Sequence, residues 1–139
     1  MSVAQPDRNV PSSKLQAKVL ALELLRITCK NIKNIHMVPK SLRWSYGKFM
    51  KSLAEDILVK IEQANSLPLE LAAEQRMLKQ SEAVGLASAL IDAIDLLYDE
   101  RNFRYNAKEK WQSAALSTLK TIKGWMKSDQ GRVKDASRK

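Results

Sequence analysis

Hydrophobic residues recur at helical spacing over four segments of the chain, and the clearest segment covers residues 38–65. Pro39 prevents a preceding helix from continuing, and the Ser41 hydroxyl is a suitable cap for the first turn of a new helix. The apolar positions then follow at steps of four, three, four, four and three residues, which places them on one face of a long helix. They are Tyr46, Met50, Leu53, Ile57, Ile61 and Ala64.

A first helix is predicted to begin at Ser12 or Ser13 and to end near Asn34, with an apolar face made of two adjacent stripes. A helix with so broad an apolar face contacts more than one neighbour, and another subunit is one option. The stripes are Leu22, Leu25, Cys29 and Ile32, and Leu20, Leu24, Ile27 and Ile35.

A third helix is predicted for residues 70–99, with a polar first part that we expect to form a loosely packed extension. Gly85 is expected to permit the close approach of a neighbouring helix. The predicted buried stripe is Val84, Ala87, Ile91, Ile94 and Tyr98.

A fourth helix is predicted to begin after Asn106, which can cap it. Its apolar positions recur at steps of four, four, three and four, and from Ser128 onward no periodicity remains. The predicted stripe is Trp111, Ala115, Leu119, Ile122 and Met126.

These patterns predict an all-α protein, an up-down-up-down antiparallel four-helix bundle that assembles into a ring-shaped homo-oligomer. Glycine and proline are sparse, four of each in 139 residues, and this length suits one domain with its own core. The expected organisation is a flexible lead at 1–13, the bundle at 14–128 and a disordered basic tail at 129–139.

Cys29 is the single cysteine, so a disulfide or a cysteine zinc site within one subunit is excluded and a reducing cytoplasm is the expected compartment. The chain has no run of about eighteen apolar residues, and its first residues lack the apolar core of a signal peptide. We therefore expect neither membrane insertion nor export.

The net charge of +9 is unevenly distributed: +5 over residues 1–40, +1 over 41–66, −5 over 67–100 and +8 over 101–139. Such polarity favours contact with a polyanion on the basic side. The alternative is that the charge serves only solubility.

Three rows of basic residues are the candidate nucleic-acid contacts, the first and third of them at helical spacing, and the alternative for the first row is an ordinary solvated face. Antiparallel pairing of the first two helices would join the first two rows into one patch. The rows are Arg26, Lys30 and Lys33, then Lys40, Arg43, Lys48 and Lys51, and finally Lys120, Lys123 and Lys127.

Trp44 and Tyr46 lie among the second row of cations. Their rings could stack on exposed bases, but aromatic residues at helical spacing are more often core or interface anchors, and we favour that interpretation.

No catalytic constellation is visible, so we expect no enzyme, no cofactor and no metal. His36, the only histidine, has no partner implied nearby and is interpreted as structural. The carboxylates near the end of the third helix are interpreted as solvated charge or a subunit contact, because no histidine or third carboxylate is arranged against them on another helix. They are Asp92, Asp95, Asp99 and Glu100.

The chain resembles the small four-helix-bundle family that includes the protein encoded by intervening sequences in bacterial large-subunit ribosomal RNA genes and the accessory variability determinant of diversity-generating retroelements. The likeness covers roughly residues 15–128 and is closer to the accessory variability determinant. It rests on the broad first helix, Pro39, the Arg43 to Gly47 step, the run ILVKIEQAN and the motif GWMK at residues 124–127.

The resemblance implies a non-enzymatic subunit of a homopentameric ring with a basic surface. It implies association with a retroelement reverse transcriptase and its template RNA, in support of mutagenic cDNA synthesis, and it suggests Arg43 and the cations of the first and last helices as contacts. RNA is the expected ligand, DNA is a second candidate, and no membrane partner is expected. The alternative is a helical protein–protein adaptor whose basic surface binds an acidic partner.

Overall fold

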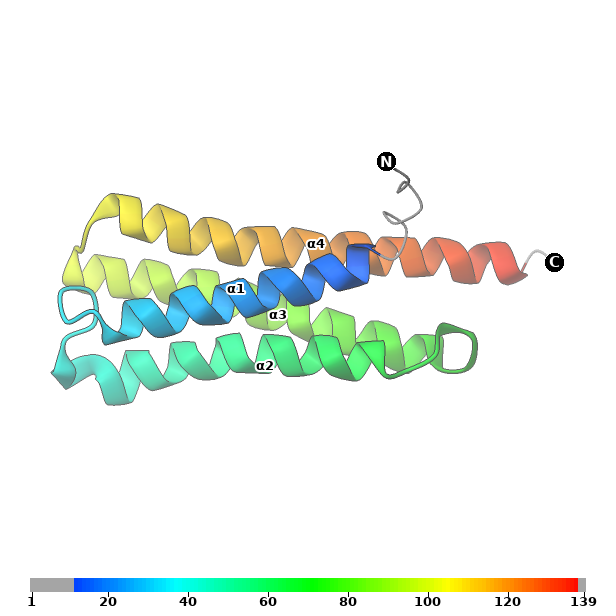
Figure 1. The fold of residues 1–139 in the computed structure, drawn as a ribbon, viewed down its shortest axis with the longest axis horizontal. Coiled ribbons are helices and arrows are strands. Elements are labelled where there is room, and N and C mark those ends of the chain that lie inside the picture. Colours follow the sequence, from blue (N-terminus) through cyan, green and yellow to red (C-terminus); the bar gives the residue numbers. More distant parts are fainter. Residues whose placement is uncertain (1–11, 138–139) are drawn as a thin grey trace, which may run out of the picture.

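The computed structural model describes residues 12–137, and this part of the chain is an all-helical four-helix bundle without strands (Figure 1). The helices are α1 (Ser12–Lys33), α2 (Lys48–Asn65), α3 (Leu69–Arg101) and α4 (Tyr105–Ser137). The all-α prediction is confirmed. Of the lead expected at 1–13, the first eleven residues lie outside the described part.

Each helix packs against two others around one core, in the cyclic order α1, α2, α3, α4. The α1–α2 connection and the α3–α4 turn lie at the same end of the bundle, and the α2–α3 connection lies at the opposite end (Figure 1). We call the first of these the double-loop end, made of residues 34–47 and 102–104.

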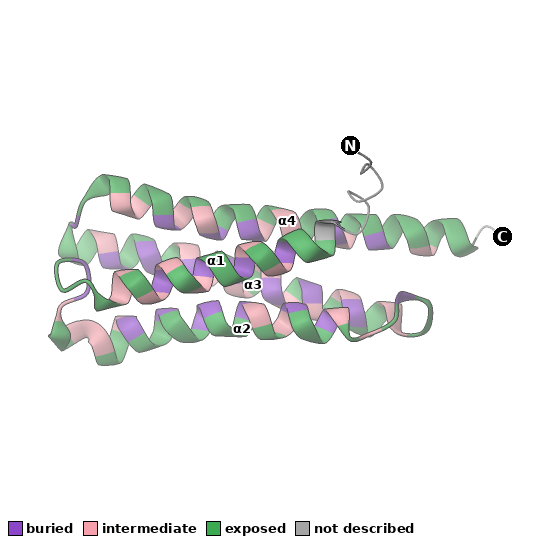
Figure 2. Ribbon diagram, in the orientation of Figure 1, coloured by how far each residue is buried: buried purple, intermediate pink, exposed green. Residues whose placement is uncertain are grey.

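Figure 2 shows buried positions recurring along the inward faces of the helices. The predicted stripe of α2 is confirmed, with Tyr46 half-buried at its end. In α1 the prediction is wrong in part: Leu22 and Ile35 are 39% and 54% exposed. Leu24 is buried as predicted, and the other buried positions of α1 are Ala17, Ala21 and Thr28.

In α3 and α4 some of the predicted core positions lie beside the buried line of the helix and not on it. Val84, Ile91, Tyr98, Leu119 and Met126 are half-buried and pack on the rim of the core. The fully buried apolar positions are Ala83, Ala87, Leu90, Ala93, Ile94 and Leu97 in α3, and Trp111, Ala115, Ile122 and Trp125 in α4.

Residues before α2 depart from the predicted single helix that starts near Ser41. A 3₁₀ turn (Lys40–Leu42) and a π-helical turn (Arg43–Gly47) precede the α-helix, and no side chain caps the start of the 3₁₀ turn after Pro39. A Cβ added at Gly47 would lie 3.2 Å from Cγ2 of Ile32. The backbone of the π turn thus lies against α1 at Gly47, a residue with no side chain.

Gly85 does not have the role predicted for it. It is exposed, and a Cβ there would meet nothing within 4 Å. The close contact is instead at Gly47, against Ile32 of α1, and small alanines are buried along α1 and α3.

Two predictions, one for the C-terminal part of α4 and one for the first part of α3, are wrong. The helix continues to Ser137, so residues 129–137 are not a disordered tail, and Asp129 is fully buried. Arg76 and Gln80 in the first part of α3 are 6% and 0% exposed, so this part is not a loose extension.

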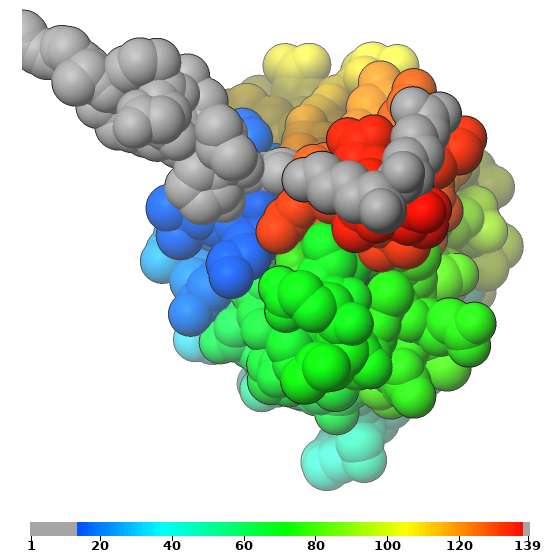
Figure 3. All heavy atoms as spheres, turned by 90° about the vertical axis from the view of Figure 1, so that its right-hand side faces the viewer, coloured from blue at the N-terminus to red at the C-terminus, as the bar shows by residue number. Residues whose placement is uncertain are grey.

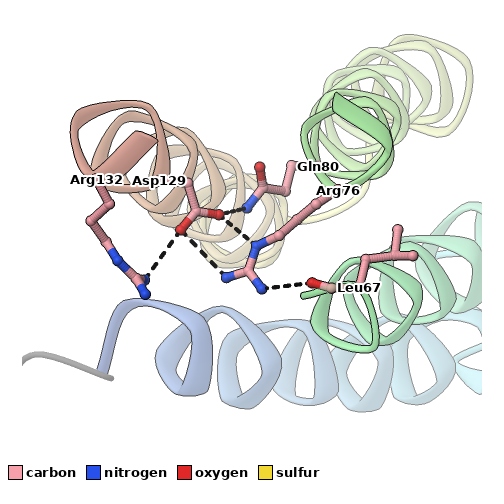
Figure 4. A network of polar contacts seen from close by, with 5 residues as sticks. All are labelled: Leu67, Arg76, Gln80, Asp129 and Arg132. Carbon is pink, nitrogen blue, oxygen red and sulfur yellow. Dashed lines mark hydrogen bonds and ion pairs between the residues drawn. The ribbon is translucent and has the colours of Figure 1, made fainter. Parts of the chain in front are cut away.

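A buried polar network joins these residues (Figure 4). Arg76 Nε donates to Asp129 Oδ2 at 2.7 Å, and Gln80 Nε2 donates to the same oxygen at 2.8 Å. Arg76 also donates to the Leu67 carbonyl at 3.0 Å and lies 5.3 Å from the ring centroid of Trp125. The network ties the α2–α3 connection to α3 and α4.

None of the helices within residues 12–137 combines the length and the apolarity that crossing a lipid bilayer requires.

Candidate nucleic-acid interface

The double-loop end holds a cleft of about 820 Å³, which we call the basic cleft. Its walls come from the last turns of α1, the α1–α2 connection, the α3–α4 turn and the start of α4. Three cations, a histidine, four asparagines and one carboxylate line it: Lys30, Arg104, Lys110, His36, Asn31, Asn34, Asn102, Asn106 and Glu109, with Ile27, Met37, Phe103 and Ala107 beneath them.

Apolar anchors on both connections hold the walls of this cleft. In the α1–α2 connection Met37 is buried, and its backbone N–H donates to the Asn34 carbonyl at 3.0 Å. In the α3–α4 turn Phe103 is buried with its ring edge-on to Tyr98, at 5.4 Å between centroids. The polar residues beside these anchors are thereby turned toward solvent.

Asn102 makes the turn possible. Its φ of 50° lies in the left-handed region, which asparagine tolerates better than most residues, and its N–H donates to the Tyr98 carbonyl. The chain can therefore leave α3 and enter α4 within three residues, which brings Arg104 and Lys110 opposite Lys30.

A second surface at the same end surrounds Trp44, on the π-helical turn. The Trp44 side chain is 83% exposed, which contradicts its interpretation as a core anchor of this chain. Beside it is an open hollow of about 450 Å³, which we call the tryptophan groove, lined by Ile32, Arg43, Trp44, Gly47, Lys48 and Lys51.

Tyr46, on the same turn, packs at the edge of the core instead of toward solvent. A hydrogen bond with the Glu100 carboxylate raises the pKa of the Tyr46 phenol above its usual value.

Arg43 has a structural contact that the sequence did not indicate. Its guanidinium donates to the carbonyl of Lys33 at 3.1 Å. Lys33 is the last residue of α1, and the unpaired carbonyls and the dipole at this end of the helix favour a cation. Arg26 lies 2.7 Å from the Glu23 carboxylate, and Lys51 lies 4.0 Å from that of Glu55. These three cations are thus partly engaged within the protein.

The remaining predicted cations, seven lysines, make no ion pair within residues 12–137, and all are exposed. Those from α1 and the start of α2 lie at the double-loop end, as antiparallel pairing predicts. Lys123 and Lys127 line a different groove, with Ser81 and Val84 of α3, so the α4 row does not join the first patch. The seven are Lys30, Lys33, Lys40, Lys48, Lys120, Lys123 and Lys127.

Arg104 and Lys110 were missed as candidates because they lie at no helical spacing from the predicted rows. The signal available was the +8 charge of residues 101–139, which did not say which cations would face the first helix. His36 is exposed and forms part of the cleft wall.

The chain matches no protein-family model, no curated protein and no solved structure.

The acidic charge of α3 is partly compensated within the bundle. Asp95 lies 3.3 Å from Lys108 Nζ, and Glu82 lies 3.1 Å from Lys60 Nζ. Hydrogen bonding to Lys60 lowers the pKa of the Glu82 carboxyl, and Lys79 adds to this effect. Across residues 12–137, no three histidine, cysteine, aspartate or glutamate side chains converge in a way that could hold a metal ion.

Proposed function

We propose that this protein binds nucleic acid electrostatically through its double-loop end. The observation that supports this most directly is the basic cleft, which Lys30 lines together with Arg104 and Lys110 from the other half of the sequence. Among the described residues that line the cleft, Glu109 supplies the one carboxylate. Exposed cations around a cleft of this size can contact several phosphates of one strand.

The wider proposal follows the resemblance of the sequence. The protein would be a non-enzymatic accessory subunit of a diversity-generating retroelement that associates with its reverse transcriptase and template RNA. Bundles of up-down-up-down topology would assemble into a homo-oligomeric ring, a pentamer by that resemblance. Such a ring would repeat the basic cleft around its axis and multiply the affinity for a long polyanion.

The affinity for a single-stranded RNA oligonucleotide, measured from about 50 to 200 mM salt, tests the binding. Each neutralised phosphate contributes about −0.7 to the slope of log affinity against log salt. Combining Lys30→Gln, Arg104→Gln and Lys110→Gln should therefore reduce the slope by about two. An affinity that does not depend on salt would contradict the proposal.

The matched control combines Lys120→Gln, Lys123→Gln and Lys127→Gln, which removes the same charge from the separate α4 row. We expect this control to weaken binding less than the cleft variant. Equal losses would mean that net charge acts without a defined site at the double-loop end.

The accessory role is tested by co-purification with a reverse transcriptase encoded beside the gene, with and without nuclease. A complex lost on nuclease treatment supports a role through RNA. A complex with an acidic partner that survives nuclease, in a protein that binds no nucleic acid, would favour the adaptor alternative.

A further inference from the structure

The position of Trp44 is energetically unfavourable for a tryptophan, because most of its large apolar ring is exposed to water. The π-helical turn Arg43–Gly47 holds it there. Turns of this kind are rare and occur frequently at functional sites. Figure 3, which views the bundle from the opposite end, shows cyan atoms of this part of the chain projecting past the outline of the helices.

The surroundings of the ring are cationic. Lys48 Nζ lies 5.6 Å from the ring centroid of Trp44, and Arg43 and Lys51 complete the charged lining of the tryptophan groove. An exposed tryptophan can also anchor a protein interface, where surrounding contacts exclude water from it. Here the exposed wall of the groove is mainly apolar, and the charged ends of Arg43, Lys48 and Lys51 give it a positive charge that complements a polyanion.

We propose that Trp44 stacks on an unpaired base, so that the double-loop end selects single-stranded over double-stranded nucleic acid. This inference rests on the proposed function. Lys48 and Lys51 are placed to contact the phosphates on either side of that base, and the basic cleft, on the other side of the α1 C-terminus, would hold the continuing strand.

Single strands are favoured because a stacking ring needs a free base face. In a duplex each base face is covered by its neighbours, and inserting a ring requires unstacking. An unpaired base can swing onto an exposed aromatic ring without that cost, and such stacking tolerates any base. The lysines alone would bind both forms, so the preference for single strands depends on the ring.

The fluorescence of the protein separates this site from the core. Trp111 and Trp125 are 0% and 2% exposed, whereas Trp44 is 83% exposed. Acrylamide therefore reaches mainly Trp44. We expect an oligonucleotide of unpaired RNA to quench the emission and to protect it from acrylamide, and the fully paired duplex of the same sequence to do neither.

Substitution of the ring gives the second measurement. Trp44→Leu should lower the affinity for the single strand about five- to a hundredfold, the loss expected for one stacked base, and change duplex affinity less than about twofold. Trp44→Phe should retain most of the affinity. The control is Leu71→Ala on α3, which removes an apolar side chain that is 86% exposed.

The possible results separate the two proposals. Equal affinity for both strand forms, or single-strand affinity unchanged in Trp44→Leu, overturns the stacking inference and leaves the salt-dependent cleft intact. No binding of either form at low salt overturns the proposed function itself. Binding of polyglutamate that is lost in Trp44→Leu would make Trp44 an anchor for an acidic protein and would also overturn the inference.

Discussion

At the scale of single residues, the most consequential side chain outside the double-loop end is Asp129. Its two oxygens accept from Arg76 and Gln80, and Arg132 Nη1 approaches at 3.6 Å from the solvent side. Burying a carboxylate is unfavourable unless its hydrogen-bonding capacity is met, and here partners from α3 and α4 meet it. Asp129 thus fixes how the ends of these two helices meet.

We predict that Asp129→Asn lowers the free energy of unfolding by about 3 kcal/mol, because it leaves the Arg76 guanidinium buried without its counter-charge. Urea unfolding measures the loss. Asp135→Asn, at an exposed position of the same helix, should stay within about 0.5 kcal/mol of the parent. A loss in Asp129→Asn no larger than this control would mean that the pair is not a structural link.

At the scale of elements, helix contacts depend on where the chain has small side chains. A Cβ at Gly47 would meet Ile32, whereas a Cβ at Gly85 or Gly124 would meet nothing within 4 Å. The contact between α1 and the turn before α2 therefore favours glycine, whereas Gly85 in α3 and Gly124 in α4 have no such role.

We predict that Gly85→Ala and Gly124→Ala each raise the free energy of unfolding by about 0.5–1 kcal/mol, because alanine loses less conformational entropy in a helix. Gly47→Ala should raise the free energy of unfolding by less, or lower it, because Ile32 must move to accommodate the methyl group. Urea unfolding of the three variants orders them. Stabilisation by Gly47→Ala equal to that of Gly85→Ala would contradict the close contact.

The contact between α2 and α3 predicts a pH dependence. Because Lys60 lowers the pKa of Glu82 in the folded protein, Glu82 stabilises the fold above its unfolded pKa of about 4.3, and this stability is lost as the pH falls through the folded value. Urea midpoints between about pH 7 and pH 3 should therefore fall more steeply for the parent than for Glu82→Gln. The control Glu74→Gln, at an exposed position of α3, should follow the parent.

At the scale of the whole molecule, folding separates cations that the sequence suggested would act together. Lys30 lines the basic cleft and Lys48 and Lys51 line the tryptophan groove, both at the double-loop end, while Lys123 and Lys127 line the α3–α4 groove. A surface of a different kind lies on α1, where Leu15, Val19 and Leu22 are 59%, 52% and 39% exposed at steps of four and three residues. In the proposed ring this stripe would be the subunit contact.

Light scattering should then report a multiple of the 15.7 kDa subunit mass. Val19→Glu should lower that mass toward a monomer, because burying an unpaired carboxylate in the contact is strongly unfavourable. Gln16→Glu adds the same charge to an exposed position of α1 beside the stripe and should leave the mass unchanged. A monomeric parent would contradict the ring, and an unaffected Val19→Glu assembly would place the contact elsewhere.

The sequence alone predicted four helices and most of their lengths, because apolar periodicity and the positions of Pro39 and Pro68 are local properties of the chain. It predicted less well which residue of each helix faces the centre. Large apolar side chains were counted as core, whereas alanine and Thr28 occupy the centre of α1, where they let the neighbouring helices approach. Only packing against those neighbours selects among adjacent apolar positions.

The polar contacts between distant segments were decided by the tertiary structure alone. Arg76 and Asp129 are separated by 53 residues, and nothing near Asp129 in the sequence distinguishes it from a charge in a solvated tail. The same holds for Lys30 and Arg104, which share one cleft only because two connections meet at one end of the bundle. Periodicity reports which face of a helix is apolar, whereas the pairing of charges depends on which helices become neighbours and in what register.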